Sequence, residues 1–250
     1  MIRSVIPFRA ARGSGDEGAS FAGLRRRYPA LTPAIALVPL VLGVGAMIRG
    51  GRLLVWDAPL TDLAVAHRTA WLNDVALVAS RLGSWAVVFP AAAVLVALAA
   101  PRSRRMAAIM VVVVLARPGV EWLLKDLVGR PRPVGARLVP GTGFAYPSGH
   151  VLAAVATWGF LPPVVALYCR RPPLRRLAVA ASATLIVLIA WSRVWLGVHW
   201  TSDVVGSLAI GFVVLSLAEA RLEPGRRQSS PAPESSWSAD VDTTLNESSS

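Results

Sequence analysis

The chain has 250 residues, 54% of them hydrophobic, and a formal net charge of +12 at neutral pH. Its mean hydropathy of +0.55 excludes an ordinary soluble domain, because so apolar a chain offers too little polar surface to water. The positive charge alone is compatible with a nucleic-acid partner, but the chain has no nucleic-acid-binding motif, so we expect no such partner. The apolar composition instead predicts a membrane protein.

The first 30 residues lack apolar periodicity and predict a flexible cytoplasmic arm over residues 1–30. Residues 31–222 contain six apolar runs, each close to the roughly 20 residues that a helix needs to cross a bilayer. The runs are Thr32–Ile48, Gly83–Ala100, Met106–Leu124, Val151–Cys169, Leu177–Trp195 and Val204–Ala218. We therefore predict an all-α bundle of six transmembrane helices, followed by a disordered, Ser- and Pro-rich cytoplasmic tail over residues 223–250.

Clusters of arginine fall at alternate ends of the apolar runs. Connections on the cytoplasmic side of a membrane carry an excess of Lys and Arg. We therefore expect a multi-pass protein of the cell membrane with both termini in the cytoplasm and the other connections on the extracytoplasmic side. The clusters are Arg25–Arg27, then Arg102, Arg104 and Arg105, then Arg170, Arg171, Arg175 and Arg176, and finally Arg221, Arg226 and Arg227.

The segment from Gly50 to Arg81 precedes the second apolar run on the expected outer side. Leu63, Ala66 and Ala70 are helically spaced in it, which predicts a helix lying along the outer surface. His67 belongs to this helix. A lone histidine on such a surface is more often structural than catalytic, and we favour the structural role.

Two opposite charges interrupt the third apolar run. Arg117 and Glu121 are one helical turn apart, and buried charges in a membrane are costly unless they are paired or hydrated. We favour a structural ion pair facing the interior of the bundle, and a substrate-facing role stays the alternative.

The first candidate cluster is Lys125 with Arg132 and Pro133, in an outer loop rich in Gly and Pro that ends at Pro147. Lys125 is the only lysine among the 26 Lys and Arg residues, which indicates that a compact point charge is needed there. Lys125 and Arg132 can neutralise the negative charge of a phosphate. Taken alone, these cations and Arg130 fit equally well as interfacial anchors that reach toward lipid headgroups.

The second candidate cluster, Pro147-Ser148-Gly149-His150, opens the fourth apolar run. The free N–H groups and the positive dipole end of a helix start form an anion site, here at Ser148 and Gly149. His150 can donate a proton to a leaving oxygen and later deprotonate an attacking water. Taken alone, the same residues would be an ordinary helix cap.

The third candidate cluster contains Ser192, Arg193, His199 and Asp203, and its sequence predicts a helix, a short turn and a second helix. His199 and Asp203 are four residues apart, so on a helix they share one face. The carboxylate can then orient one imidazole nitrogen and leave the other free as a base or nucleophile. Arg193 adds a third cation. Taken alone, the pair would be a structural hydrogen bond.

All three clusters fall on the outer side, and together they suit phosphoryl transfer through His199. The carboxylates near them are Glu121, Asp126 and Asp203, with two of the three histidines. That set is small for enzymes that clamp a phosphate between two metal ions. We therefore expect a mechanism without a metal and without a cofactor.

In this order, the motifs K-x6-R-P, P-S-G-H and S-R-x5-H-x3-D resemble the signature of the type 2 phosphatidic acid phosphatase superfamily, with every defining letter present between Lys125 and Asp203. The resemblance implies a helical, integral-membrane phosphatase that forms a phosphohistidine at His199 without a metal. It assigns acid and base catalysis to His150 and orientation of His199 to Asp203. The residues to which it assigns phosphate binding are Lys125, Arg132, Ser148, Gly149 and Arg193.

A site at the outer membrane interface favours a substrate whose phosphate lies at that interface. We therefore expect a phosphoric monoester or diphosphate hydrolase that acts on a lipid phosphate or diphosphate, such as phosphatidic acid or a polyprenyl diphosphate. Two alternatives stay open: a lipid phosphotransferase, and a lipid-phosphate binding or transport protein without catalysis. The sequence also leaves open the identity of the lipid, the oligomeric state and whether the loop Val134–Tyr146 closes over the site.

Overall fold

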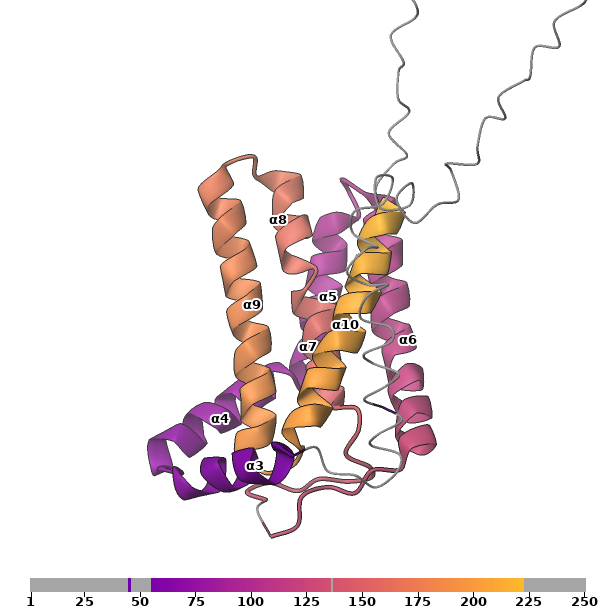
Figure 1. Ribbon diagram of the computed structural model, residues 1–250. Coiled ribbons are helices and arrows are strands. Elements are labelled where there is room, and N and C mark those ends of the chain that lie inside the picture. Colours follow the sequence, from indigo (N-terminus) through magenta and orange to yellow (C-terminus); the bar gives the residue numbers. More distant parts are fainter. Residues whose placement is uncertain (1–44, 46–54, 136, 223–250) are drawn as a thin grey trace, which may run out of the picture.

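A computed structural model describes residue 45 and residues 55–135 and 137–222, and these ranges contain helices and no strand. Figure 1 shows long helices packed side by side, with two shorter helices lying across one end. The expected cytoplasmic arm (1–30), the first apolar run (32–48) and the expected tail (223–250) lie outside the described residues. The helices are α3 (Asp57–Ala66), α4 (Ala70–Leu82), α5 (Trp85–Ala99), α6 (Arg104–Val128), α7 (Gly149–Trp158), α8 (Leu161–Tyr168), α9 (Pro172–Trp195) and α10 (Thr201–Leu222).

Four stretches of the described chain are long and apolar enough to cross a membrane: α6, α7 with α8, α9 and α10. The predicted run at Gly83–Ala100 appears as α5, which reaches that length only together with α4, and these two helices meet at a bend of 48°. The described residues therefore contain four candidate spans, or five if the bent pair counts as one. The expected sixth, Thr32–Ile48, is outside them.

The fourth run is divided between α7 and α8. Gly159 and Phe160 separate the two helices, and α8 has prolines in its first turn. Proline is compatible with the start of a helix because no N–H is needed there. The sequence pair Pro162-Pro163 therefore marks the beginning of a new helix within this span.

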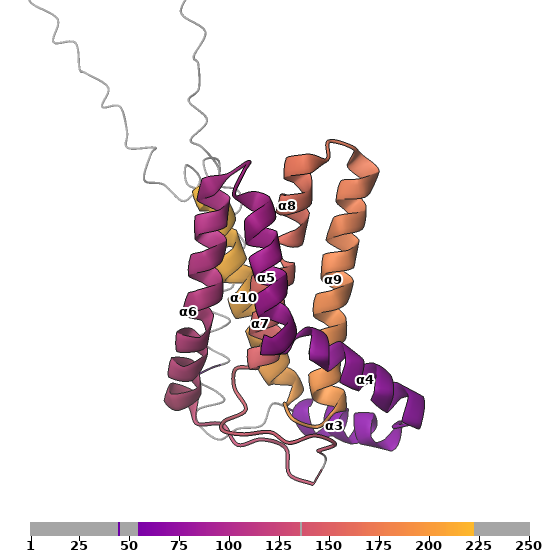
Figure 2. The ribbon, with the colours of Figure 1, turned by 180° about the vertical axis from the view of Figure 1, so that it is seen from behind.

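The surface segment before the second run forms two helices instead of one. Figures 1 and 2 show α3 and α4 lying across the same end of the bundle as the α9–α10 turn. The helix is interrupted at His67 and Arg68. The Arg68 Nη2 atom there donates a hydrogen bond to the Trp195 carbonyl at 2.6 Å. α4 packs along α9. Both helices are thereby fixed to the segment that carries the third motif.

A left-handed glycine ends α6 and turns the chain into the outer loop. Gly129 has φ 62° and donates its N–H to the Lys125 carbonyl at 2.9 Å, which is the αL form of a helix end. The loop that follows, described over residues 129–135 and 137–148, crosses the end of the bundle in both views (Figures 1 and 2). Lys125 is thus the last-turn residue of α6, and Arg132 belongs to the loop.

Two glycines let α10 approach the residues around the second motif. A Cβ on Gly206 would lie 2.6 Å from the ring of Tyr146, and one on Gly211 would lie 2.6 Å from Val155. Real Cβ atoms do not approach so closely, so these glycines permit the contact of α10 with α7 and with the end of the loop. The opposite end of the bundle is apolar, with Met110, Phe160 and Val164 in its core.

Candidate active site

The three sequence motifs meet at the end of the bundle that α3 covers. The third motif occupies the end of α9, the turn 196–200 and the first turn of α10, and the second motif starts α7. The first motif lies at the end of α6 and in the loop. The predicted helix, turn and helix of the third motif is confirmed, but His199 lies in the turn and α10 begins only at Thr201, so His199 and Asp203 do not share a helix face.

His199 is buried, with 2% of its surface exposed, and its two ring nitrogens have different partners. Nδ1 lies 2.7 Å from the carbonyl oxygen of Ala145. A carbonyl oxygen only accepts hydrogen bonds, so Nδ1 carries the proton and Nε2 of the neutral ring is unprotonated and can accept a hydrogen bond. Nε2 lies 3.2 Å from Nη1 of Arg132. The ring therefore presents an unprotonated nitrogen beside a cation.

Burial lowers the pKa of His199 to about 4, although the nearby Asp203 carboxylate raises it; Arg132 and Arg193 lower it further. A histidine with such a pKa is neutral at physiological pH. The neutral form is the one that can attack phosphorus.

Asp203 stands behind His199 but does not make the hydrogen bond that the sequence led us to expect. Its Oδ2 atom is 3.7 Å from Nδ1 of His199 and accepts the N–H of Trp200 at 2.9 Å. The reason is the turn at 196–200, in which Gly197 has a φ of 70° and the chain leaves the helical path. The carbonyl of Ala145 takes the orienting position, and Asp203 contributes its charge.

A buried ion network joins Asp203 to a helix that carries no sequence motif. Arg130 is 3% exposed and donates from Nη1 to Asp203 and from Nη2 to Oδ2 of Asp57 at 2.6 Å. Asp57, in the first turn of α3, is fully buried and also accepts the N–H of Ser202 at 2.9 Å. The alternative of Arg130 as an interfacial anchor is therefore wrong, because its guanidinium is enclosed between two carboxylates.

Sequence reasoning missed Asp57 and the role of Arg130. Arg130 stands two residues before Arg132 in the same R-P-R-P stretch, and this repeat was the available signal. Asp57 gave no distinguishing signal, because an acidic residue in the first turn of a helix is common. Only the packing of α3 under the bundle brings it to this site.

Arg132 is held by the backbone of the loop and of the catalytic turn. Its guanidinium donates to the carbonyls of Thr142 at 2.8 Å, Gly143 at 3.0 Å and Val198 at 2.6 Å. Three such bonds fix the plane of the guanidinium beside Nε2 of His199. A phosphate that is attacked by Nε2 therefore meets a pre-oriented cation.

Two buried polar atoms of the predicted phosphate-binding residues lack a hydrogen-bond partner among the described residues: Oγ of Ser148 and Nε of Arg193. Arg193 uses its Nη1 atom to donate to Oγ of Ser80, and the N–H of Ser148 donates to Oγ of Ser207 at 2.7 Å. Buried polar atoms are nearly always paired. These two atoms, beside the start of α7, are suited to an anionic ligand.

His150 lies in the first turn of α7, partly buried, and its electrostatic environment includes Arg193, His199 and Lys125. His150 and His199 are therefore close enough for the charge of one to act on the other. Lys125 is also on this side, with its Nζ atom 2.7 Å from Oε1 of Glu121. The expected ion pair of Arg117 and Glu121 is confirmed at 2.6 Å.

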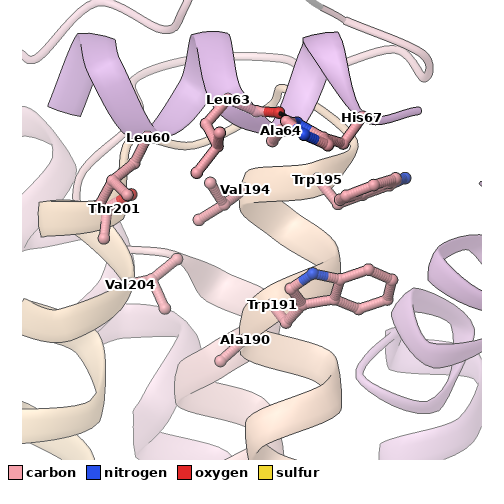
Figure 3. Close-up of a pocket in the computed structure, with 10 residues that line it drawn as sticks. All are labelled: Leu60, Leu63, Ala64, His67, Ala190, Trp191, Val194, Trp195, Thr201 and Val204. Carbon is pink, nitrogen blue, oxygen red and sulfur yellow. Dashed lines mark hydrogen bonds between the residues drawn. The ribbon is translucent and has the colours of Figure 1, made fainter. Parts of the chain in front are cut away.

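A separate apolar cavity of about 480 Å³ lies between α3, α9 and α10. Figure 3 shows Leu63 of α3 and His67, the residue that follows α3, on one side of it and Trp191 and Trp195 of α9 on another. The predicted site residues are not among those that line it. His67 donates from Nδ1 to the carbonyl of Leu63 at 2.9 Å, which agrees with the structural role favoured for it.

No three His, Cys, Asp or Glu side chains in the described ranges are grouped so that they could hold a metal ion. The cations of the three motifs are Lys125, Arg132 and Arg193. The arrangement thus holds a neutral imidazole, a second imidazole and three cations.

Comparison with known proteins shows which proteins this chain resembles. A family model described as the PAP2 superfamily matches residues 105–220, a range that includes every predicted site residue but not Asp57. Phosphatidylglycerophosphatase B of Bacillus subtilis is 27% identical over 191 residues, which cover 74% of this chain and 92% of that protein. Lipid phosphate phosphatase delta of Arabidopsis thaliana is 33% identical over 106 residues, which cover 38% of this chain and 26% of that protein.

A solved structure is also similar. The crystal structure of a transmembrane PAP2 type phosphatidylglycerolphosphate phosphatase from Bacillus subtilis matches with a TM-score of 0.66 and 25% identity, over 75% of this chain and 94% of that one. These relatives are named as phosphatases, that is, phosphoric ester hydrolases, so the predicted enzyme class is confirmed by homology. Residues 105–220 thus match the PAP2 superfamily, and the apolar helices together with the membrane-protein relatives support a multi-pass membrane protein.

Proposed function

We propose that the protein hydrolyses lipid phosphates through a phosphohistidine at His199, without a metal ion. The observation that carries the proposal is the environment of the His199 ring. Its Nδ1–H is directed to the Ala145 carbonyl, so that Nε2 is unprotonated and accepts a hydrogen bond from the Arg132 guanidinium. This geometry supports attack on phosphorus and leaves proton transfer to another residue.

The first step forms a bond between Nε2 of His199 and phosphorus and breaks the bond from phosphorus to the lipid oxygen. His150 donates a proton to that oxygen, and the lipid alcohol leaves. Lys125, Arg132 and Arg193 neutralise the charge that accumulates on the phosphoryl oxygens, together with the backbone at Ser148 and Gly149. The Ala145 carbonyl and the Asp203 carboxylate stabilise the positive charge of the phosphorylated ring.

The second step reverses the roles. His150, now neutral, takes a proton from a water molecule while its oxygen attacks phosphorus, and the N–P bond to His199 breaks. Inorganic phosphate and the original enzyme result. Each step conserves charge and protons with the two imidazoles alone.

The substrate in this proposal is the phosphate of a membrane lipid. The names of the relatives favour a phosphatidylglycerophosphate headgroup, and the site's cations suit phosphatidic acid or a polyprenyl diphosphate equally well. Full-length protein in detergent should release inorganic phosphate from at least one member of a panel of these three lipids. Release from none of them, by folded protein, would overturn the proposal.

The nucleophile is tested by His199→Ala, with His67→Ala as the matched control because His67 lies outside the three motifs. We expect His199→Ala to lose turnover and His67→Ala to keep it. Quenching a reaction with ³²P-labelled lipid should trap an acid-labile, alkali-stable label on the wild-type protein and none on His199→Ala. Transfer of label to an added alcohol in place of water would favour the phosphotransferase alternative, and binding without turnover would favour the transport alternative.

We also propose that the domain of residues 31–222 has six spans, with the first at 32–48, and that its site faces the extracytoplasmic side of the cell membrane. The arginine-bearing connections, α5–α6 and α8–α9, lie at the end of the bundle away from the site (Figure 1). Under the positive-inside rule that end is cytoplasmic, as are the arm and the tail.

The native cysteine offers a direct test of this orientation. Cys169 follows α8 at the arginine-rich end and is partly exposed. An impermeant thiol reagent added to intact cells should leave Cys169 unlabelled, and it should label a cysteine placed at the exposed Val134 of the outer loop in a Cys169→Ala background. The reverse pattern would contradict the orientation.

A further inference from the structure

Two cations and one carboxylate alternate along the last turns of α6. Oε2 of Glu121 accepts from Nη1 of Arg117 at 2.6 Å, and Oε1 accepts from Nζ of Lys125 at 2.7 Å. Residues four apart on a helix share one face, so the three side chains form a continuous row. Lys125, which the proposed function assigns to the phosphate, is therefore held by a carboxylate of its own helix.

This carboxylate lies against the start of α7. A Cβ on Gly149 would be 2.2 Å from Oε1 of Glu121, and Nη1 of Arg117 also approaches the Gly149 carbonyl at 3.3 Å. The start of α7 is the place where backbone N–H groups favour an anion. Glu121 thus puts a fixed negative charge beside the position that the phosphate must reach.

We propose that Glu121 is a positioning residue that competes with phosphate for Lys125 and thereby promotes release of the phosphate product. The inference rests on the proposed function. In the absence of phosphate, Glu121 keeps the Lys125 ammonium at the edge of the anion site. A bound phosphate shares or takes over that ammonium. After hydrolysis, the carboxylate recovers Lys125 and repels the inorganic phosphate.

The competing charge affects substrate and product differently. A carboxylate at the edge of the site weakens binding of every anion, whether it is attached to a lipid or free. The lipid substrate gains further binding from its apolar chain, which inorganic phosphate lacks. The net effect of Glu121 is therefore to shorten the residence of the product while the substrate stays bound by its chain.

Glu121→Gln tests the inference, because glutamine keeps the size and an acceptor oxygen but removes the charge. We expect inorganic phosphate to inhibit this variant with a Ki lower by about tenfold, the order expected from removing one like charge near a partly screened site. We also expect a lower KM and a lower kcat, since product release becomes slower. The matched control is Asp126→Asn, which removes an exposed carboxylate of the same helix and should change Ki by less than about twofold.

A second variant keeps the inference testable if Glu121→Gln folds poorly. Arg117→Gln leaves Glu121 bound to Lys125 alone, so the carboxylate should compete more strongly and inorganic phosphate should bind more weakly. Binding is read from the shift of the thermal unfolding midpoint with added inorganic phosphate, which needs no turnover. An unchanged or higher Ki in Glu121→Gln, with kcat alone reduced, would overturn the inference and leave Glu121 as a purely structural pair.

The two proposals fail in distinguishable ways. If the protein releases no phosphate from lipids but inorganic phosphate still stabilises Glu121→Gln more than the wild type, the competition for Lys125 stands and the proposed reaction falls. If lipid phosphate is hydrolysed, and the wild type and Glu121→Gln are stabilised equally by inorganic phosphate, the proposed reaction is supported and the proposed role of Glu121 is contradicted.

Discussion

The two sides of the anion site are built differently. On one side, which we name the His199 wall, His199, Asp203, Arg130 and Asp57 are between 0% and 3% exposed. On the other, the Lys125 wall, the side chains of Arg117, Glu121 and Lys125 are 15%, 18% and 23% exposed. The ion pairs of the first wall join residues 73 apart in the sequence, whereas those of the second join residues four apart.

This difference indicates how the site divides its tasks. Buried charges are costly unless every partner is in place, so the His199 wall has one arrangement and holds the nucleophile rigidly. The Lys125 wall consists of partly exposed ion pairs along α6, with Arg117 also donating to the Gly149 carbonyl, and such pairs exchange partners at small cost. Under the proposed function, a rigidly held His199 and adjustable cations suit a site that must bind an anion and later release it.

The largest expected effect is on the stability of the His199 wall. Arg130→Met leaves Asp57 and Asp203 as buried carboxylates without their shared cation, which should cost about 3–5 kcal/mol of unfolding free energy. The measurement is the thermal unfolding midpoint in detergent. Arg137→Met, at an exposed arginine of the same loop, is the control and should leave the midpoint nearly unchanged. If both variants are equally stable, the contrast between the two walls disappears.

The second expected effect is a dependence on acidic pH that His199 imposes. Its folded-state pKa of about 4 lies below the ordinary value of 6.5, so the unfolded chain takes up a proton that the folded protein does not. Stability contributed by this residue is therefore complete above pH 6.5 and is lost as the pH falls from 6.5 through 4. Unfolding midpoints of the wild type and His199→Gln across this range should differ in slope, with the flatter curve for the variant.

The same pKa predicts the acidic limb of the activity profile. In the proposed function the neutral ring is the nucleophile, so kcat/KM should decline only as the pH approaches about 4, and not near 6.5. A decline centred near pH 6.5 would show that the ring in the free enzyme is more hydrated than its burial indicates. The substrate should be a water-soluble phosphate ester, so that titration of lipid headgroups does not contribute to the pH profile.

A smaller effect, on kcat/KM, should follow from crowding the contact between Gly149 and Glu121. Gly149→Ala places a methyl group where the Glu121 carboxylate lies, so Glu121 must move and Lys125 with it. Displacements of about 1 Å in a catalytic site can cost up to ~10²-fold in rate, and we expect a fall in kcat/KM of that order or less. In a Glu121→Ala background the same substitution should have a clearly smaller effect. Equal losses in both backgrounds would show that the methyl group disturbs α7 itself.

The smallest expected effect is on the stability of the Lys125 wall. Arg117→Met removes one partner of a partly exposed pair on a single helix. It should lower the unfolding free energy by less than about 1 kcal/mol, which is read from the shift of the thermal unfolding midpoint. A cost comparable to that of Arg130→Met would show that the Lys125 wall is as rigid as the His199 wall.

Much of the site was predictable because each motif is local. The cations, the histidines and the helix start at Ser148 lie in short stretches whose chemistry can be recognised residue by residue. The ion pair of Arg117 with Glu121 was predictable for the same reason, since four-residue spacing on a helix places the two side chains together. The hydrogen-bond partner of His199 Nδ1 was not predictable, because a backbone carbonyl carries no sequence signal. In addition, the four-residue spacing to Asp203 suggested a helix, and the turn at Gly197 interrupts that helix.

The sequence by itself determined that the protein is a helical membrane protein, and it located the three motifs that carry the cations and histidines of the proposed site. Apolar runs specify spans through their length, and motif residues specify chemistry through their side chains, and neither depends on distant contacts. Tertiary structure alone decided that Asp57, from a helix without a motif, is buried against Arg130 and Ser202. The physical reason is that a buried charge is stable only where packing brings partners from distant segments around it, and such proximity is a property of the fold and not of any one stretch of chain.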